Sequence, residues 1–322
     1  MSRWIAALAA AAIVSASSAY GQQDPAKNYP SKPVRALVPF AAGGGVDYIA
    51  RVIVDKMFDG AAGRIVIENK PGGGGILASE TVARATPDGY TLFFAPPSPI
   101  TLNPALYSKL PYNPDDLVPI SQVVSFPMVL VANKDLPVKT APELVAWAKA
   151  NPAKSNFGGT AATFQMLGFM FRKATGIPYE FINYKSTTEV TTAMIGGDVA
   201  MGILDTGPIS APIKNGQIKA LAVTPPTRSE FFPNIPTFKE QGIDVEYVGW
   251  VGIFAPKGTP QSIINKIEAE AIRAMKNPDV QKQLRAREIG PTGTTAEAFR
   301  RAIKIETAHW AVVAKENNFK LD

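Results

Sequence analysis

The chain has 322 residues, of which 46% are hydrophobic and 19% are charged, a balance that supports a sizeable core and argues against disorder. It has no cysteine and one histidine, His309, which excludes disulfides, thiolate chemistry, zinc–cysteine sites and multi-histidine metal sites. The net charge of +6 is dispersed and includes no run of four basic residues, so we expect no nucleic-acid partner.

The first 21 residues have the pattern of an export signal. Arg3 supplies a positive charge, Trp4 to Val14 form an apolar run, and small residues follow as far as Gly21. This run is shorter than the roughly 20 residues that a membrane-spanning helix needs, and the alternative is a buried N-terminal helix. We therefore expect residues 1–21 to be a signal peptide, and the mature protein to be soluble and periplasmic. Without cysteine we expect no lipid anchor.

Strands and helices alternate in the first part of the mature chain. Strands are predicted at Val34–Phe40, Arg64–Asn69 and Thr91–Ala95. Glycine turns lead from the first two strands into predicted helices at about 47–58 and 76–85. Short glycine turns between alternating strands and helices are typical of βαβ units and of a parallel sheet.

An apolar stretch at Val123–Ala132, broken by Pro127, leads into a second α/β block. Its predicted strands lie near 155–157, 179–184, 199–204 and 218–224, and its predicted helices at 141–150, 164–175, 188–195 and 207–214. An extended segment is expected at Val245–Phe254, followed by helices at about 260–276, 278–286 and 295–318. The last helix begins with the capping-box pattern Thr294-Thr-Ala-Glu297.

These two blocks predict two lobes, because the chain leaves the first block near 121–125 and returns near 247–251. Two crossing segments make a hinge, and the cleft between two lobes is the default ligand site. We expect residues 29–122 plus 250–322 to form lobe 1 and residues 123–249 to form lobe 2.

The most informative motif is the glycine turn Ala41–Gly45, which follows the first predicted strand. Glycines let a ligand approach the backbone, and the next helix begins with free N–H groups, so this turn is either an anion receptor or simply a tight turn. It matches neither the nucleotide P-loop nor the dinucleotide-binding pattern, and we expect no cofactor. A second candidate is Gly158–Thr163 in the other block, where Thr160 and Thr163 alternatively serve as helix caps.

Two charged residues end strands at the same edge of the second block. Asp205 either caps the next helix or binds a hydrogen-bond donor of a ligand, and Lys185 either neutralises a second carboxylate or is solvated. Trp250 and Phe254, on the returning segment, are interpreted as hinge or core packing residues, and the alternative is that they stack on a ligand. His309 is interpreted as a structural or surface residue.

Several short motifs are spread from residue 29 to the C-terminus. They are Tyr29–Arg35, Val38–Gly44 with Asp47, Glu68–Gly74, Pro87–Leu92 and Ala255–Pro260. Together they resemble the Bug (TctC) family of extracytoplasmic solute-binding proteins, many of which serve tripartite tricarboxylate transporters. The resemblance implies an α/β, type II periplasmic-binding-protein fold, with two α/β lobes joined by a two-segment hinge, that closes around a small carboxylate.

The resemblance also implies a set of ligand-binding residues. On one side these belong to the first glycine turn: Phe40, Ala41, Gly43, Gly44 and Asp47. On the other side they belong to the small-residue loop and the acidic loop of the second lobe: Gly159, Thr160, Ala161, Ala162 and Asp205. Ser98 is added as a further donor and Lys185 as a partner for a second carboxylate. This chain lacks the serine and histidine that many members have in the second loop, and Phe164 with Phe126 either lines an aromatic-tolerant pocket or belongs to the core.

We therefore expect a periplasmic solute-binding protein, not an enzyme, that delivers a small organic carboxylate to the membrane permease of a tripartite tricarboxylate transporter. A dicarboxylate is preferred, either aromatic, such as phthalate or terephthalate, or aliphatic, such as adipate, and tricarboxylates remain open. Two alternatives are a binding protein that reports its ligand to a membrane sensor kinase, and a periplasmic hydrolase using Asp47 and Asp205 as acid and base. A monomer suits a carrier that closes about a hinge.

Overall fold

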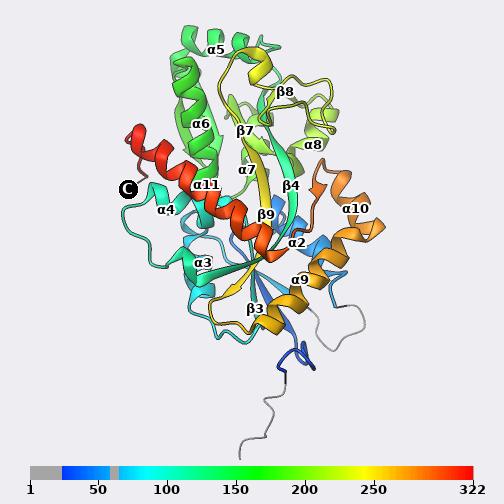
Figure 1. Ribbon diagram of the computed structural model, residues 1–322. Helices are drawn as coiled ribbons and strands as arrows, with labels where there is room; N and C mark the ends of the chain where they lie inside the picture. The colour runs from blue at the N-terminus through cyan, green and yellow to red at the C-terminus, as the bar shows by residue number, and fades with distance from the viewer. Residues whose placement is uncertain (1–23, 59–64, 322) are drawn as a thin grey trace, which may run out of the picture.

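The computed structural model of the protein describes residues 24–58 and 65–321 (Figure 1). The predicted signal peptide, residues 1–21, lies outside the described residues. The described strands are joined in the order β2-β1-β3-β9-β4-β7-β5-β6, and β8 and β10 also pair with β4. Their bounds are β1 Val34–Val38, β2 Ile65–Asn69, β3 Thr91–Ala95, β4 Leu117–Asn133, β5 Asn156–Gly159, β6 Glu180–Asn183, β7 Met201–Asp205, β8 Ile218–Val223, β9 Val248–Pro256 and β10 Gly290–Pro291.

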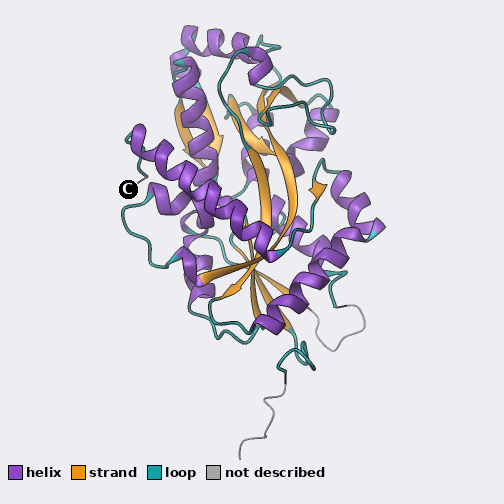
Figure 2. Ribbon diagram, viewed as in Figure 1, coloured by secondary structure: helices purple, strands orange, loops and turns teal. Residues whose placement is uncertain are grey.

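Helices flank both ends of this sheet (Figure 2). In chain order they are α2 Gly45–Val54, α3 Ile76–Ala83, α4 Asn103–Leu106, α5 Ala141–Ala150, α6 Ala162–Thr175, α7 Thr187–Gly196, α8 Thr206–Lys214, α9 Gln261–Lys276, α10 Pro278–Arg285 and α11 Ala296–Glu316. A short π-helical segment, η2, covers Ser98–Leu102. None of the described helices combines the length and the apolar character that crossing a membrane requires.

The sheet divides into two α/β lobes, as the alternating pattern predicts. In the first lobe β1 pairs in parallel with β2 and β3, and β9 joins β3 in the antiparallel direction. In the second lobe β5 pairs in parallel with β6 and β7. Helices cover both faces, which is why strands such as β1 and β4 are almost continuously apolar and buried.

The long strand β4 runs through both lobes. It pairs with β9 as far as Pro127, and from Met128 onward with β7. The prediction that Pro127 breaks this segment is therefore wrong. Pro127 lies where the strand changes partners, and a residue without an N–H group is tolerated where the ladder of hydrogen bonds is interrupted. The antiparallel pair β4–β9 supplies the two crossing segments that the sequence predicts.

The C-terminal helix α11 begins one residue later than the capping-box pattern indicates. Thr295 is the N-cap, and its hydroxyl accepts a hydrogen bond from the N–H of Ala298. The hydroxyl of Thr294 instead accepts a hydrogen bond from the N–H of Gln122 in β4. This tertiary bond overrides the local pattern. In Figure 1, α11 lies diagonally across the front of the molecule, and just beyond its end Phe319 stacks on Phe169 of α6, with 4.5 Å between ring centroids.

Candidate functional site

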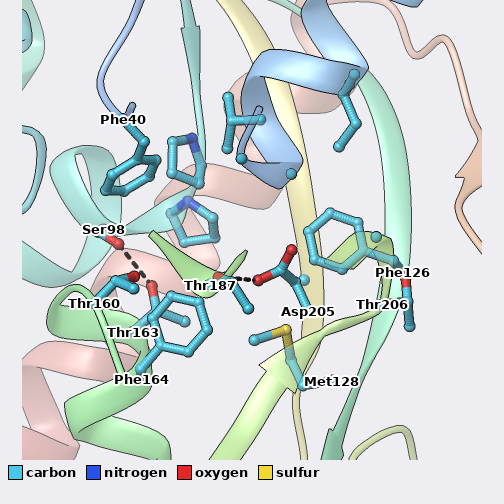
Figure 3. Close-up of a pocket in the computed structure, with 18 of the residues that line it drawn as sticks. Phe40, Ser98, Phe126, Met128, Thr160, Thr163, Phe164, Thr187, Asp205 and Thr206 are labelled. Carbon is cyan, nitrogen blue, oxygen red and sulfur yellow. Dashed lines mark hydrogen bonds between the residues drawn. The ribbon is translucent and has the colours of Figure 1, made fainter. Parts of the chain in front are cut away.

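A cavity lies between the two lobes, beside the crossing strands (Figure 3). Phe40, the start of α2 and the segment from Pro96 to Ser98 line it from the first lobe. The starts of α6, α7 and α8 line it from the second lobe. The full set is Phe40, Gly44, Gly45, Val46, Ile49, Pro96, Pro97, Ser98, Phe126, Met128, Thr160, Thr163, Phe164, Ser186, Thr187, Asp205, Thr206, Gly207, Tyr247, Gly249 and Ile289.

Several helices begin at this cavity, and three of them lack a side-chain cap. The N-cap residues of α2, α6 and α8 are Gly44, Ala161 and Asp205, and none of their side chains makes a capping hydrogen bond. Only α7 is capped, by Ser186, whose hydroxyl accepts from the N–H of Glu189. Uncapped helix starts expose N–H groups and the positive end of the helix dipole, so they attract an anion.

The β1–α2 loop is held in shape by Asp47. Its carboxylate accepts hydrogen bonds from the Gly43 N–H (2.8 Å), Asn69 Nδ2 (2.9 Å) and Arg51 Nε (3.0 Å). Burial alone raises the pKa of Asp47, but these bonds and the charge of Arg51 outweigh it and hold the pKa below its ordinary value of 3.8. Gly43 has a φ of +82°, which favours glycine at this turn. Asp47 does not line the cavity, so it shapes the loop from behind.

Hydroxyl groups gather at one end of the cavity. Ser98 Oγ of η2 and Thr163 Oγ1 of α6 are hydrogen-bonded at 2.8 Å across the two lobes. Thr160 lies beside them and is 8% exposed. The Tyr247 hydroxyl is buried near Thr163 but forms no hydrogen bond of acceptable geometry with a described residue. Burial and the nearby Glu306 carboxylate raise the pKa of Tyr247 well above 10, so this hydroxyl stays protonated as a donor.

Asp205 lies on the opposite side of the cavity from this hydroxyl cluster. It occupies the N-cap position of α8, yet its side chain caps nothing, and instead Thr187 Oγ1 donates to its Oδ1 at 2.6 Å. Burial raises the pKa of the Asp205 carboxyl, against the hydrogen bond from Thr187, which lowers it. Of the two interpretations that the sequence left open for Asp205, capping by its side chain is the one that the structure contradicts.

The cavity brings together part of the predicted set. Its lining includes Phe40, Gly44, Ser98, Thr160 and Asp205. It does not include Ala41, Gly43, Asp47, Gly159, Ala161, Ala162 and Lys185. Gly159 faces the Cβ of Phe164 and the ring of Phe181, and Lys185 is exposed. Phe126 and Phe164, whose role the sequence left open, line the cavity.

Other lining residues escaped the sequence analysis. Thr187 stands two residues after Lys185 at the start of α7, so the strand-end signal used for Lys185 could have found it. Tyr247 and Met128 line the cavity because the crossing strands run along one side of it. His309 is exposed and Trp250 packs against Phe299, in line with the roles predicted for them. The described residues contain no group of three or more side chains suited to holding a metal ion.

A family model described as "Tripartite tricarboxylate transporter family receptor" matches residues 49–319. The chain belongs to this family, TctC. Similar proteins include BugT of Bordetella pertussis, which is 33% identical to this chain over 302 residues. The aligned region covers 92% of this chain and 92% of BugT. The periplasmic binding protein BugD superposes with a TM-score of 0.86 at 31% identity, covering 91% of this chain and 99% of BugD. A Rhodopseudomonas palustris protein solved with adipate superposes with a TM-score of 0.85 at 27% identity, covering 89% of this chain and 97% of that protein.

Membership of the TctC family agrees with the two-lobe architecture and indicates the general function of the chain, solute binding. The chain is a periplasmic solute-binding protein, and its family comprises receptors of tripartite tricarboxylate transporters. The family and the structural neighbours are binding proteins and not enzymes. The interlobe cavity is the candidate ligand site of this TctC protein.

Proposed function

We propose that this protein captures a small organic carboxylate in the interlobe cavity and delivers it to the membrane permease of a tripartite tricarboxylate transporter. The observation that carries the proposal is the convergence of uncapped helix starts and buried hydroxyls on one cavity. Each helix start contributes about 0.3–1 kcal/mol to binding an anion. Each charge-assisted hydrogen bond adds about 1.5–3 kcal/mol. A few such contacts reach micromolar affinity, about −8 kcal/mol, without a cationic side chain.

The predicted ligand-binding residues have two proposed roles, direct contact with the ligand and support of the loops around it. Phe40, Gly44, Ser98, Thr160 and Asp205 are proposed as contacts, because they line the cavity. The predicted residues behind the lining are proposed to shape the two loops whose N–H groups face the ligand: Ala41, Gly43, Asp47, Gly159, Ala161 and Ala162. Lys185, which is exposed, is retained only as a distant partner for a second carboxylate.

Within this ligand class the sequence prefers a dicarboxylate, aromatic or aliphatic. The structural neighbour from R. palustris was solved with adipate, an aliphatic dicarboxylate. Phe40, Phe126 and Phe164 give the cavity apolar walls that suit the hydrocarbon part of either type. A hydrolase is disfavoured, because it would need Asp47 and Asp205 to face one substrate and Asp47 is occupied behind its loop.

The proposed function also implies a division of the chain into lobes, a site of processing and an oligomeric state. We propose residues 29–122 plus 250–322 as lobe 1 and 123–249 as lobe 2, with a hinge close to the partner change in β4. We further propose that residues 1–21 are removed on export and that the mature protein is a monomer without a lipid anchor. A sensor kinase remains the alternative recipient of the ligand signal.

A thermal-shift screen tests the proposal. Monocarboxylates, aliphatic and aromatic dicarboxylates, citrate and acidic amino acids would be added to the mature protein one by one. A ligand at 100 times its dissociation constant stabilises the fold by about 2.7 kcal/mol, which is easily seen. We expect a shift confined to one carboxylate class, and no shift with any carboxylate would contradict the proposal.

A pair of threonine variants checks that the cavity is the site. Thr160→Val removes a lining hydroxyl at nearly constant shape, and we expect it to weaken the best carboxylate of the screen about tenfold or more. Thr192→Val is the matched control, because Thr192 is exposed on α7 and its hydroxyl donates to the Thr188 carbonyl. Equal affinities for the two variants would place the ligand elsewhere.

A further inference from the structure

The two sides of the cavity differ in hydrogen-bonding character. Ser98, Thr160 and Thr163 stand together on one side in Figure 3, and Asp205 with Thr187 stands on the other. The hydroxyls can donate hydrogen bonds, and the start of α6 adds its uncapped N–H groups. The Asp205 side presents a carboxylate, which in its ionised form can only accept.

Among the described residues, the lining of the cavity supplies no cation that would balance a second anionic group. None of the described residues lining it is lysine, arginine or histidine, and Asp205 is the single carboxylate among them. Lys185, just before α7, is exposed and lies outside the lining, and two other cations on neighbouring elements are engaged elsewhere. Arg51 bonds Asp47, and Lys214 pairs with Glu288. A carboxylate placed against Asp205 would therefore meet a like charge, which only the helix starts of α2 and α8 offset and no cationic side chain of the described lining neutralises.

Asp205 keeps one oxygen open. Thr187 donates to Oδ1, which fixes the orientation of the carboxylate. Oδ2 accepts no hydrogen bond from any other described residue, although it lies at the wall of the cavity beside Gly45. An oriented acceptor in a partly desolvated site without a partner favours a ligand that supplies the missing donor.

We propose that Asp205 selects a donor group on the ligand, so that the protein prefers a carboxylate bearing an ammonium, amide or hydroxyl group at its other end over a dianionic dicarboxylate. This inference rests on the proposed function, because it assigns the ligand carboxylate to the hydroxyl side of the cavity. The apolar walls formed by Phe40, Phe126 and Phe164 lie against the segment between the two ends.

Ligands of matched length test the inference directly. Adipate, the monoamide of adipic acid and 6-aminohexanoate share a carboxylate and a chain, and differ at the far end. Calorimetry on the wild-type protein should give the monoamide or the amino acid an affinity about tenfold or more above that of adipate. The aromatic series of terephthalate and its monoamide should show the same order.

Asp205→Asn supplies a donor in place of the acceptor and should reverse this preference toward the dicarboxylate. Asp198→Asn is the matched control, since Asp198 is exposed on the same lobe, and it should leave the order unchanged. Two results would overturn the inference and leave the proposed function standing. One is a dicarboxylate whose affinity for the wild type equals that of its monoamide. The other is an Asp205→Asn protein that keeps the wild-type order of affinities. Failure of every carboxylate to bind overturns the proposed function itself and this inference with it.

Discussion

Gly45, the first residue of α2, and Asp205, the N-cap of α8, approach so closely that a Cβ atom on Gly45 would lie 2.4 Å from Asp205 Oδ2. The two residues belong to different lobes and face each other across the cavity wall. Because Thr187 holds the carboxylate by its other oxygen, Asp205 has little freedom to move aside. The contact between α2 and α8 therefore depends on the absence of a side chain at position 45.

Gly45→Ala should weaken ligand binding. Overpacking a close contact costs about 1–3 kcal/mol, and here the cost would fall on the contact between the two lobes at the cavity, which predicts a loss of affinity of about tenfold. Isothermal titration with the tightest carboxylate of the screen measures the effect. Gly196→Ala is the control, because a Cβ there would meet only Asp198 Oδ2, at an ordinary 3.8 Å. Unchanged affinity in a correctly folded Gly45→Ala protein would show that the lobes tolerate the extra methyl group.

Local signals account for the parts of this structure that the sequence predicts. Strands that end in glycine turns and continue into helices fix the βαβ units of both lobes without reference to distant residues. Gly44, Thr160 and Asp205 follow predicted strands, where helix starts and ligands meet, and Phe40 was added by the resemblance to the family.

Long-range pairing accounts for what the sequence misses. The pairing of β4 with β9 joins segments far apart in the chain and has no local signature. It brings to the cavity Tyr247, which the sequence analysis missed, and Phe126, whose role that analysis left open. The same cause explains Pro127, which ends one strand pairing and precedes another. It also explains Thr294, whose hydroxyl bonds β4 rather than capping α11.

The hydroxyl pair Ser98–Thr163 should stabilise the fold as a unit. Both residues are almost fully buried, so Ser98→Ala or Thr163→Val leaves a buried hydroxyl without its partner and should lower the free energy of unfolding by about 1–3 kcal/mol. The double variant removes both groups and should lose less than the sum of the two single changes. Urea denaturation of all four proteins measures this coupling. Strict additivity would mean that the two hydroxyls act independently.

Asp205 and Asp47 should give stability profiles of opposite sign with pH. The pKa of Asp205 is raised in the folded protein, so its contribution to stability is fully present below the unfolded value of 3.8 and is lost as the pH rises through the folded pKa. The pKa of Asp47 is lowered, so its contribution is present above 3.8 and is lost as the pH falls through the folded pKa. Urea unfolding at a series of pH values on either side of 3.8 compares the wild type with Asp205→Asn and Asp47→Asn. Relative to Asp205→Asn, the wild type should lose stability as the pH rises. Relative to Asp47→Asn, it should lose stability as the pH falls. The same direction of change in both comparisons would contradict the environments assigned to the two carboxyl groups.

Trp310 should report ligand binding through its fluorescence. Its ring lies 5.8 Å from that of Tyr247, which lines the cavity, and its Nε1 donates to Glu306 at 3.1 Å. Trp250 donates to the same carboxylate at 2.7 Å, which ties the crossing strand β9 to α11. A ligand that engages the Tyr247 hydroxyl should shift this cluster and change the tryptophan emission. Trp147→Phe, on α5 of the second lobe, should keep the change and Trp310→Phe should lose most of it, with calorimetry verifying that both variants still bind. The reverse pattern would mean that the signal comes from α5 and not from the floor of the cavity.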